Sequence, residues 1–148
     1  MKPTPNGWPR LSSSLFYLEP AKAIDFLCAA FGFEVRIRID GPPGVVIHSE
    51  LTYGGAVVMV STDSTAPGAN HQDAPHRSPR SVQGANTQIL FVYVDDTDAH
   101  CARARSAGAK IINEPATSDY GPEHWTDRGY ECEDPEGHRW YFAHRVRG

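Results

Sequence analysis

One order of predicted elements occurs twice along this chain, and this internal repeat limits the possible folds more than any other feature. In the first half the residue pattern predicts a strand, a helix and three strands, at residues 11–18, 21–31, 34–39, 45–52 and 56–61. In the second half it predicts the same series, at residues 88–94, 99–107, 110–113, 130–133 and 139–143. Two similar βαβββ modules in one α+β domain are the simplest account.

Signals at the ends of the two predicted helices support this alignment of the halves. In the first helix, apolar residues recur at three- and four-residue spacing from Ile24 to Phe31, and Gly32 provides a stop. In the second, Asp96 supplies a capping side chain and Gly108 provides the stop. The two helices therefore occupy equivalent places in the two modules.

The repeat also predicts how the chain is divided. We expect an N-terminal extension over residues 1–8 and one domain over residues 9–146. That domain comprises a module at 9–61, a loop at 62–86 and a module at 87–146. The loop is long and polar, which is typical of a lid, a partner contact or a flexible linker. Its histidines, His71 and His76, are conceivable metal ligands, but a polar loop without cysteines favours solvated side chains.

Composition and charge exclude several classes of function. The 148 residues include 14 basic and 18 acidic side chains, and a net charge of −4 argues against nucleic-acid binding. No run approaches the roughly 18 apolar residues of a membrane helix. The first ten residues, MKPTPNGWPR, lack the apolar run of a signal peptide. Three separated cysteines favour reduced, buried thiols. We therefore expect a soluble cytoplasmic protein without a membrane partner.

Five short segments, in their order and spacing, resemble one known family. They are residues 23–33 (AIDFLCAAFGF), 48–51 (HSEL), 92–100 (VYVDDTDAH), 104–109 (ARSAGA) and 134–140 (DPEGHRW). Together they resemble the glyoxalase, bleomycin-resistance and extradiol-dioxygenase group, the vicinal oxygen chelate superfamily, over residues 9–145. The resemblance implies that two βαβββ modules curl their mixed sheets into a cup for a small molecule. It also implies a homodimer.

The resemblance further assigns positions to a metal site, and the side chains there do not suit a metal. Counting along the family's pattern gives Ser12, Ile89, Tyr141 and, with a one-residue ambiguity, Val58 or Met59. Divalent metals of this kind need imidazole or carboxylate donors. We therefore expect no metal and no cofactor, which leaves glyoxalase or dioxygenase activity without its usual centre.

Strand alternation predicts which side chains line the cup and which face the helices. The helix-facing set is Leu11, Ser13, Leu15, Tyr17, Ile47, Leu51, Leu90, Val92, Val94, Trp140 and Phe142. The expected ligand-binding set is Ser12, Ser14, Phe16, His48, Glu50, Val58, Ile89, Phe91, Tyr93, Trp125, Glu131, Glu133, Arg139 and Tyr141. This set combines aromatic surface with a few polar groups, as ligand pockets do. The same aromatics could instead fill the sheet interior as core residues.

Three functional hypotheses remain open. The first is a metal-free protein of antibiotic-resistance type that sequesters an aromatic or cationic compound, as bleomycin-resistance relatives do. The second is a lyase, isomerase or dioxygenase in which His48 acts as a general base tuned by Glu50, Glu131 or Glu133, or in which these four hold a metal at a non-standard place. The third is a scaffold whose cup is closed by side chains and binds nothing tightly.

Overall fold

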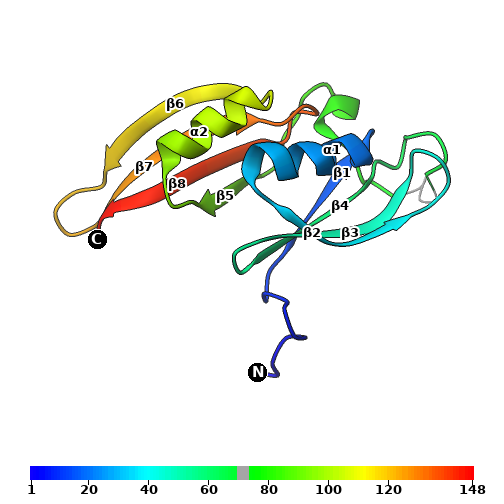
Figure 1. The fold of residues 1–148 in the computed structure, drawn as a ribbon, viewed down its shortest axis with the longest axis horizontal. Coiled ribbons are helices and arrows are strands. Elements are labelled where there is room, and N and C mark those ends of the chain that lie inside the picture. The colour runs from blue at the N-terminus through cyan, green and yellow to red at the C-terminus, as the bar shows by residue number, and fades with distance from the viewer. Residues whose placement is uncertain (70–73) are drawn as a thin grey trace.

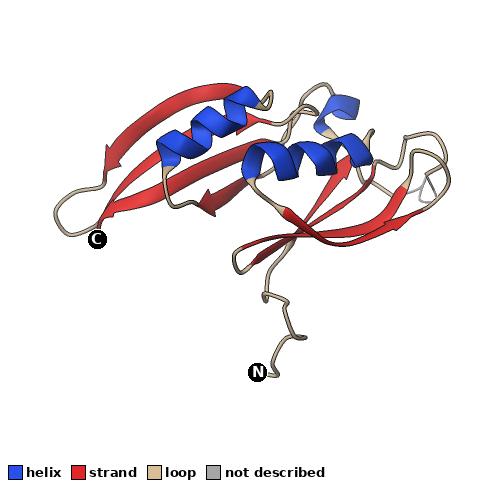
Figure 2. Cartoon of the chain, in the orientation of Figure 1, coloured by secondary structure: helices blue, strands red, loops and turns tan. Residues whose placement is uncertain are grey.

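The chain folds into two four-stranded sheets, each covered on one face by a helix (Figures 1 and 2). The computed structural model describes residues 1–69 and 74–148, so His71 lies outside the described residues. The first half contains β1 (Ser13–Tyr17), α1 (Pro20–Phe26), a π-helical turn η1 (Leu27–Phe31), β2 (Glu34–Asp40), β3 (Val46–Tyr53) and β4 (Ala56–Thr62). After a short 3₁₀ helix η2 (Pro79–Val82), the second half contains β5 (Ile89–Tyr93), α2 (Thr97–Ser106), β6 (Lys110–Asp119), β7 (Thr126–Glu133) and β8 (Arg139–Arg147).

Both sheets have the same topology, which confirms the predicted repeat of βαβββ modules. The strand orders are β1-β4-β3-β2 and β5-β8-β7-β6, with the first strand of each module parallel to the last. The other neighbouring strands are antiparallel. We call the face of each sheet that is turned away from the helices its open face.

The helices begin and end where the sequence signals place them. The Asp96 carboxylate accepts a hydrogen bond from the backbone N–H of Ala99 at 3.0 Å, which caps α2. Gly32 ends η1 with a φ of 83°, a left-handed conformation that glycine adopts without a Cβ clash. The last turn of the first helix is π-helical, which the apolar spacing did not reveal. No helix within the described residues is long and apolar enough to cross a membrane.

Three strands of the second sheet, β6, β7 and β8, are longer than the sequence predicts. β6 continues to Asp119 through Pro115, and β7 begins at Thr126 in a polar segment. The β6–β7 register shifts between Asn113 and Ala116, so the proline lies at an irregularity of an edge strand, where no ladder hydrogen bond is lost. This lengthening gives the second sheet a larger open face than the alternation pattern implied.

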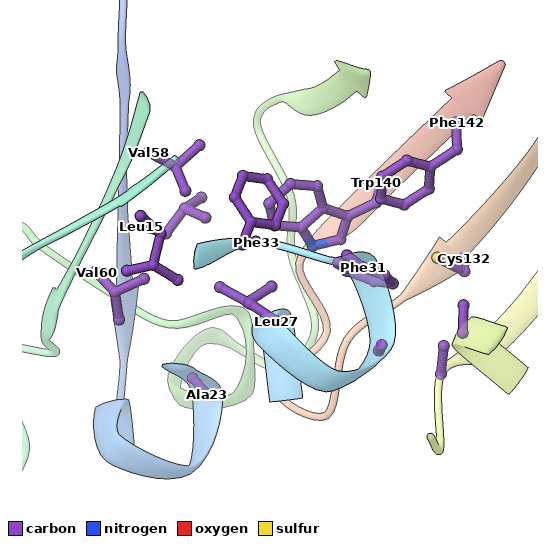
Figure 3. Packing of buried hydrophobic residues seen from close by; sticks show 14 of the residues in the cluster. Leu15, Ala23, Leu27, Phe31, Phe33, Val58, Val60, Cys132, Trp140 and Phe142 are labelled. Carbon is purple, nitrogen blue, oxygen red and sulfur yellow. The ribbon is translucent and has the colours of Figure 1, made fainter. Parts of the chain in front are cut away.

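The hydrophobic core lies between the helices and both sheets. Phe31 at the end of η1 packs on Phe142 of β8, with ring centroids 4.7 Å apart. Phe33 contacts Trp140 of the same strand at 5.7 Å. Figure 3 shows these side chains from the two modules meeting around Trp140. The halves therefore share one core, and burial within it raises the pKa of the Cys132 thiol to about 12.

Two buried acids hold the modules together at the β7–β8 turn. The Glu136 carboxylate accepts hydrogen bonds from the backbone N–H groups of Leu18 and Glu19, both at 2.8 Å, just before α1. The Tyr17 hydroxyl donates to Asp134 at 2.7 Å. Burial raises the pKa of Asp134, although the hydrogen bond from Tyr17 opposes this shift. The acidic turn thus anchors the end of β1 against the second module.

The described part of the long loop after β4 folds back on the body. The Asp63 carboxylate is fully buried and accepts hydrogen bonds from the backbone N–H of Ser78 at 2.5 Å and from the Ser81 hydroxyl at 2.6 Å. It also accepts from the backbone N–H of Thr65 at 2.7 Å. Burial opposes ionisation, but these hydrogen bonds outweigh it and lower the pKa of Asp63. This carboxylate therefore fixes both ends of the described loop.

Candidate ligand-binding site

Three aromatic side chains form a continuous surface on the open face of the second sheet. Phe91 and Tyr141 are register partners on β5 and β8, and their rings stack with centroids 5.2 Å apart at 25°. Tyr93 contacts Phe91 edge-on at 5.1 Å. Phe91 is 53% exposed and Tyr93 is 51% exposed, so these rings are outside the core. We call Phe91, Tyr93 and Tyr141 the aromatic platform.

A glycine in β7 makes room for the platform. A Cβ at Gly129 would lie 2.4 Å from the hydroxyl oxygen of Tyr141 and 2.6 Å from its ring. The ring therefore lies flat against the bare backbone of the neighbouring strand. Glycine inside a strand often marks such a close approach. Gly129 was not among the predicted site residues, because it precedes the predicted strand at residues 130–133 and lies in the part of β7 that the sequence did not reveal.

Arg145 links the platform to a rim of further aromatic side chains. Its guanidinium donates to the Tyr93 hydroxyl at 2.6 Å and to the Asp127 carboxylate at 2.5 Å. It also lies over the ring of Trp125, 5.3 Å from the centroid. Trp125 is therefore at the edge of the site, where the sequence places it, and Tyr120 packs against it at 5.3 Å.

The acidic side chains of this face are ion-paired. Arg139 contacts the carboxylates of Glu131 at 2.8 Å and Glu133 at 2.9 Å. Lys110 also approaches Glu133 at 3.3 Å. Because arginine offsets these charges, the two glutamates that strand alternation places on this face do not act as free carboxylates.

The open face of the first sheet differs from expectation at Val58. Val58 is buried in the hydrophobic core, so the position that points to the open face in β4 is Met59. The Met59 sulfur accepts a weak contact from the Ser14 hydroxyl at 3.9 Å. The one-residue ambiguity of the sequence is thereby resolved, and Val58 is not on the expected face.

Two helix-facing assignments were also wrong. Leu11 precedes β1 and is 88% exposed, because the strand begins two residues later than predicted. Ile47 is half exposed, whereas Val46 next to it is buried in the core. The β2–β3 register shifts between Ile39 and Asp40, and this irregularity reverses the alternation at the start of β3. The remaining predicted alternation, with Leu15 and Tyr17 in the core, agrees with the structure.

His48 and Glu50 form a hydrogen-bonded pair on the first sheet. The His48 Nε2 atom lies 3.0 Å from a carboxylate oxygen of Glu50, and Arg36 donates to the other oxygen at 2.7 Å. Arg36 in turn lies over the ring of Trp8, 4.9 Å from its centroid. The hydrogen bond from His48 and the Arg36 guanidinium lower the pKa of Glu50. Arg36 and Trp8 were not predicted, since nothing in the sequence spacing relates residue 8 to residue 36.

The side chains at the family's metal positions do not fit a metal. Ser12 just before β1 and Met59 of β4, with Ile89 and Tyr141 on the second sheet, offer no imidazole or carboxylate. The non-standard set of His48, Glu50, Glu131 and Glu133 is divided between the two sheets. Among the described residues no three His, Cys, Asp or Glu side chains gather as a metal group.

Comparison with known proteins identifies related chains. The family model described as Glyoxalase/Bleomycin resistance protein/Dioxygenase superfamily matches residues 13–142. An uncharacterized protein of Mycobacterium tuberculosis is 34% identical over 142 residues, which cover 96% of this chain and 78% of the relative. TioX from Micromonospora sp. ML1 superposes with a TM-score of 0.68 at 28% identity, covering 93% of this chain and 99% of TioX.

A second solved structure has a more informative name. TnmS3, an antibiotic binding protein from Streptomyces sp. CB03234, superposes with a TM-score of 0.60 at 20% identity. The match covers 91% of this chain and 93% of TnmS3. At this identity the likeness shows a shared fold.

Proposed function

We propose that this chain, which belongs to the glyoxalase/bleomycin resistance protein/dioxygenase superfamily, binds a small planar aromatic compound on its aromatic platform without a metal ion. The observation that carries this proposal is the half-exposed stack of Phe91 on Tyr141, with Tyr93 against its edge. Rings that served only as core would be buried, as Trp140 and Phe142 are on the other face of β8. A planar ligand would cover apolar surface and add a ring to the stack.

The charges of the site favour an aromatic ligand over a cationic one. The faces of the platform rings attract a cation, but no unpaired carboxylate lies beside them, because Glu131 and Glu133 already pair with Arg139. Asp127 likewise pairs with Arg145. A carboxylate partner for a cationic ligand would require one of these ion pairs to break. Stacking of an aromatic ligand on the platform does not require an ion pair to break. In our proposal the affinity therefore increases with the area of the ligand's ring system.

Antibiotics with fused aromatic rings are the ligand class that we propose. TnmS3 has the same fold and is by name an antibiotic binding protein, but its 20% identity carries the fold and not the ligand. The platform itself supports the ligand class, since each stacked pair contributes about 0.5–1.5 kcal/mol beyond its area. Such binding would sequester the compound without altering it.

Thermal melting with a panel of polycyclic aromatic compounds tests the proposal. A ligand present at about 100 times its Kd should stabilise the fold by about 2.7 kcal/mol. Phe91→Leu keeps apolar volume but removes the ring, so the stabilisation should largely disappear. The matched control is Trp8→Leu, a ring-to-leucine change at the Trp8–Arg36 contact outside the platform, and it should keep the shift. A panel that leaves the melting temperature unchanged would remove the proposal.

The homodimer expected from the family resemblance is part of the proposal. Two apolar side chains of β2, Ile37 and Ile39, are 43% and 50% exposed. Exposed apolar side chains along an edge strand are the kind of surface that a second copy covers. Light scattering during gel filtration should give twice the chain's 16.3 kDa mass. A monomer at all concentrations would contradict this part.

The His48–Glu50 pair favours an enzyme as a second candidate function. A carboxylate that holds one nitrogen of a histidine leaves the other free to accept a proton, as a general base does. Glu50 is itself fixed by Arg36, so the pair is held in place. Any turnover found with this protein should fall about 100-fold or more in His48→Ala. Turnover retained in that variant would eliminate the enzyme hypothesis at this pair.

A further inference from the structure

A stacked pair of rings separates two cavities at the far end of β1. The rings of Phe16 and His76 are nearly parallel, at 11°, with centroids 4.2 Å apart. On one side is a cavity of about 210 Å³ bounded by Val46 and Ile47. On the other is a cavity of about 190 Å³ bounded by Arg77 and Gln88. Both cavities include Phe16 and His76, so this pair is the wall between them.

The wall can open by rotation of one side chain. The backbone around His76 is fixed, because its carbonyl accepts from the Ser64 N–H at 2.9 Å and the Ser78 N–H donates to buried Asp63. The His76 ring is exposed and makes no side-chain hydrogen bond to any residue that the structure describes. Exposed side chains change rotamer in picoseconds to nanoseconds. Rotation of this ring would join the two cavities and uncover one face of Phe16.

The size of the joined space suits a planar ring system. A cavity of about 150 Å³ lined by apolar side chains is large enough for benzene. The cavity beside Ile47, lined by apolar side chains together with Ser61, Thr62 and His76, is about 210 Å³. With the second cavity added, a fused pair of rings fits. The uncovered face of Phe16 supplies the stacking surface that His76 occupies in the closed arrangement.

The second cavity adds a positive charge. Arg77 is half-buried, and its guanidinium makes long contacts of 3.4 Å to the carbonyls of Ala74 and His76. No carboxylate of the described residues lies within ion-pair distance of it. Guanidinium groups bind carboxylates through paired, charge-assisted hydrogen bonds. A ligand that offers a carboxylate here would replace two weak contacts with strong ones.

We propose that this place is a second binding site, for a planar aromatic carboxylate. The ring stacks on Phe16 in place of His76, and the carboxylate pairs with Arg77. The site is separate from the aromatic platform, since neither Phe91 nor Tyr141 borders either cavity. It also differs in chemistry, because the platform recognises ring area and this site recognises a ring together with a negative charge.

Fluorescence titration with 2-naphthoate, and with the uncharged 2-naphthamide, tests the proposal. Arg77→Gln should weaken the binding of naphthoate by about tenfold or more, because the ion pair is lost. The affinity for naphthamide, which has no charge to pair, should not change. Phe16→Leu should weaken the binding of both ligands by about two- to tenfold, because it removes the ring on which they stack. His76→Ala should strengthen the binding of both ligands by about two- to tenfold, since the ligand no longer has to displace the histidine ring.

A platform variant distinguishes this site from the proposed function. Phe91→Leu should leave the Arg77-dependent part of naphthoate binding unchanged, whereas it should abolish the binding of polycyclic compounds to the platform. If Phe91→Leu weakens the binding of naphthoate and Phe16→Leu does not, this proposal is overturned, and the proposed ligand binding at the aromatic platform is supported. No saturable binding at millimolar naphthoate would overturn it outright, as would equal losses of both ligands in Arg77→Gln. Unchanged melting temperatures of the variants would exclude unfolding as a cause.

Discussion

Replacing Gly129 with alanine should destabilise this protein through one side chain, Tyr141. The new Cβ would lie 2.4 Å from the Tyr141 hydroxyl oxygen, well inside contact distance, so the ring must leave the strand. Departure breaks its stack on Phe91, worth about 0.5–1.5 kcal/mol. Introducing atoms into packed regions costs about 1–3 kcal/mol in general. Alanine in a strand recovers about 0.5–1 kcal/mol relative to glycine. The midpoints of these ranges combine to a net loss of about 2 kcal/mol.

The decisive comparison uses a Tyr141→Ala background. There the clash is absent, so Gly129→Ala should stabilise by about 0.5–1 kcal/mol and its sign should reverse. Urea denaturation followed by circular dichroism gives the four free energies of unfolding. In the natural background the melting temperature should fall by about 4–8 °C, since 1 kcal/mol is about 2–4 °C at this size. If Gly129→Ala has the same effect in both backgrounds, the ring does not lie where we describe it.

Three further outcomes follow from the buried acids. Asp63→Asn should lower the free energy of unfolding by about 2–4 kcal/mol in urea denaturation, since an amide cannot accept all the hydrogen bonds that converge there; a change within error would contradict its role. Glu136→Gln should cost about 1–3 kcal/mol by the same assay, because an amide group would face a backbone N–H; an unchanged midpoint would show that the two modules do not need this contact. Since the pKa values of Asp63 and Glu50 are lowered in the folded state, both stabilise it above their unfolded pKa values, and stability should fall as pH drops below about 4 through the lowered values. Melting temperatures at pH 3–6 test this, and the Asp63→Asn variant should lose less than the natural protein; an equal loss would mean that other groups cause it.

The fold was predictable because its signals are local and repeated. Helical spacing, the Asp96 cap and Gly32 each determine the structure of a few neighbouring residues, and each element is present where they place it. The limits of the second-sheet strands were less predictable. Pro115 in β6 and the polar residues at the start of β7 are not typical of strands. These segments are strands because they pair with segments far away in the sequence. Such pairing is not encoded in a short window of residues.

For the candidate site, the sequence predicted which face of the sheet most side chains lie on, but not which ion pairs they form. Alternation places Phe91, Tyr93 and Tyr141 on the open face, and the structure agrees. Alternation fails at Ile47, where an irregular register shifts the pattern by one residue. Alternation also places Glu131 and Glu133 of β7 on this face, but it does not show that Arg139 of the neighbouring strand β8 pairs with both. Charge in a site depends on such pairs, which a count of residues does not reveal.

The most direct test of metal-free aromatic binding is a melting experiment on protein treated with chelator. Metal content is measured first, and then the shift caused by the best polycyclic ligand is measured with and without chelator and with added divalent metals. We expect substoichiometric metal and a ligand shift that chelator leaves unchanged and Phe91→Leu removes. A stoichiometric metal, or a ligand shift that disappears with chelator, would contradict the central claim.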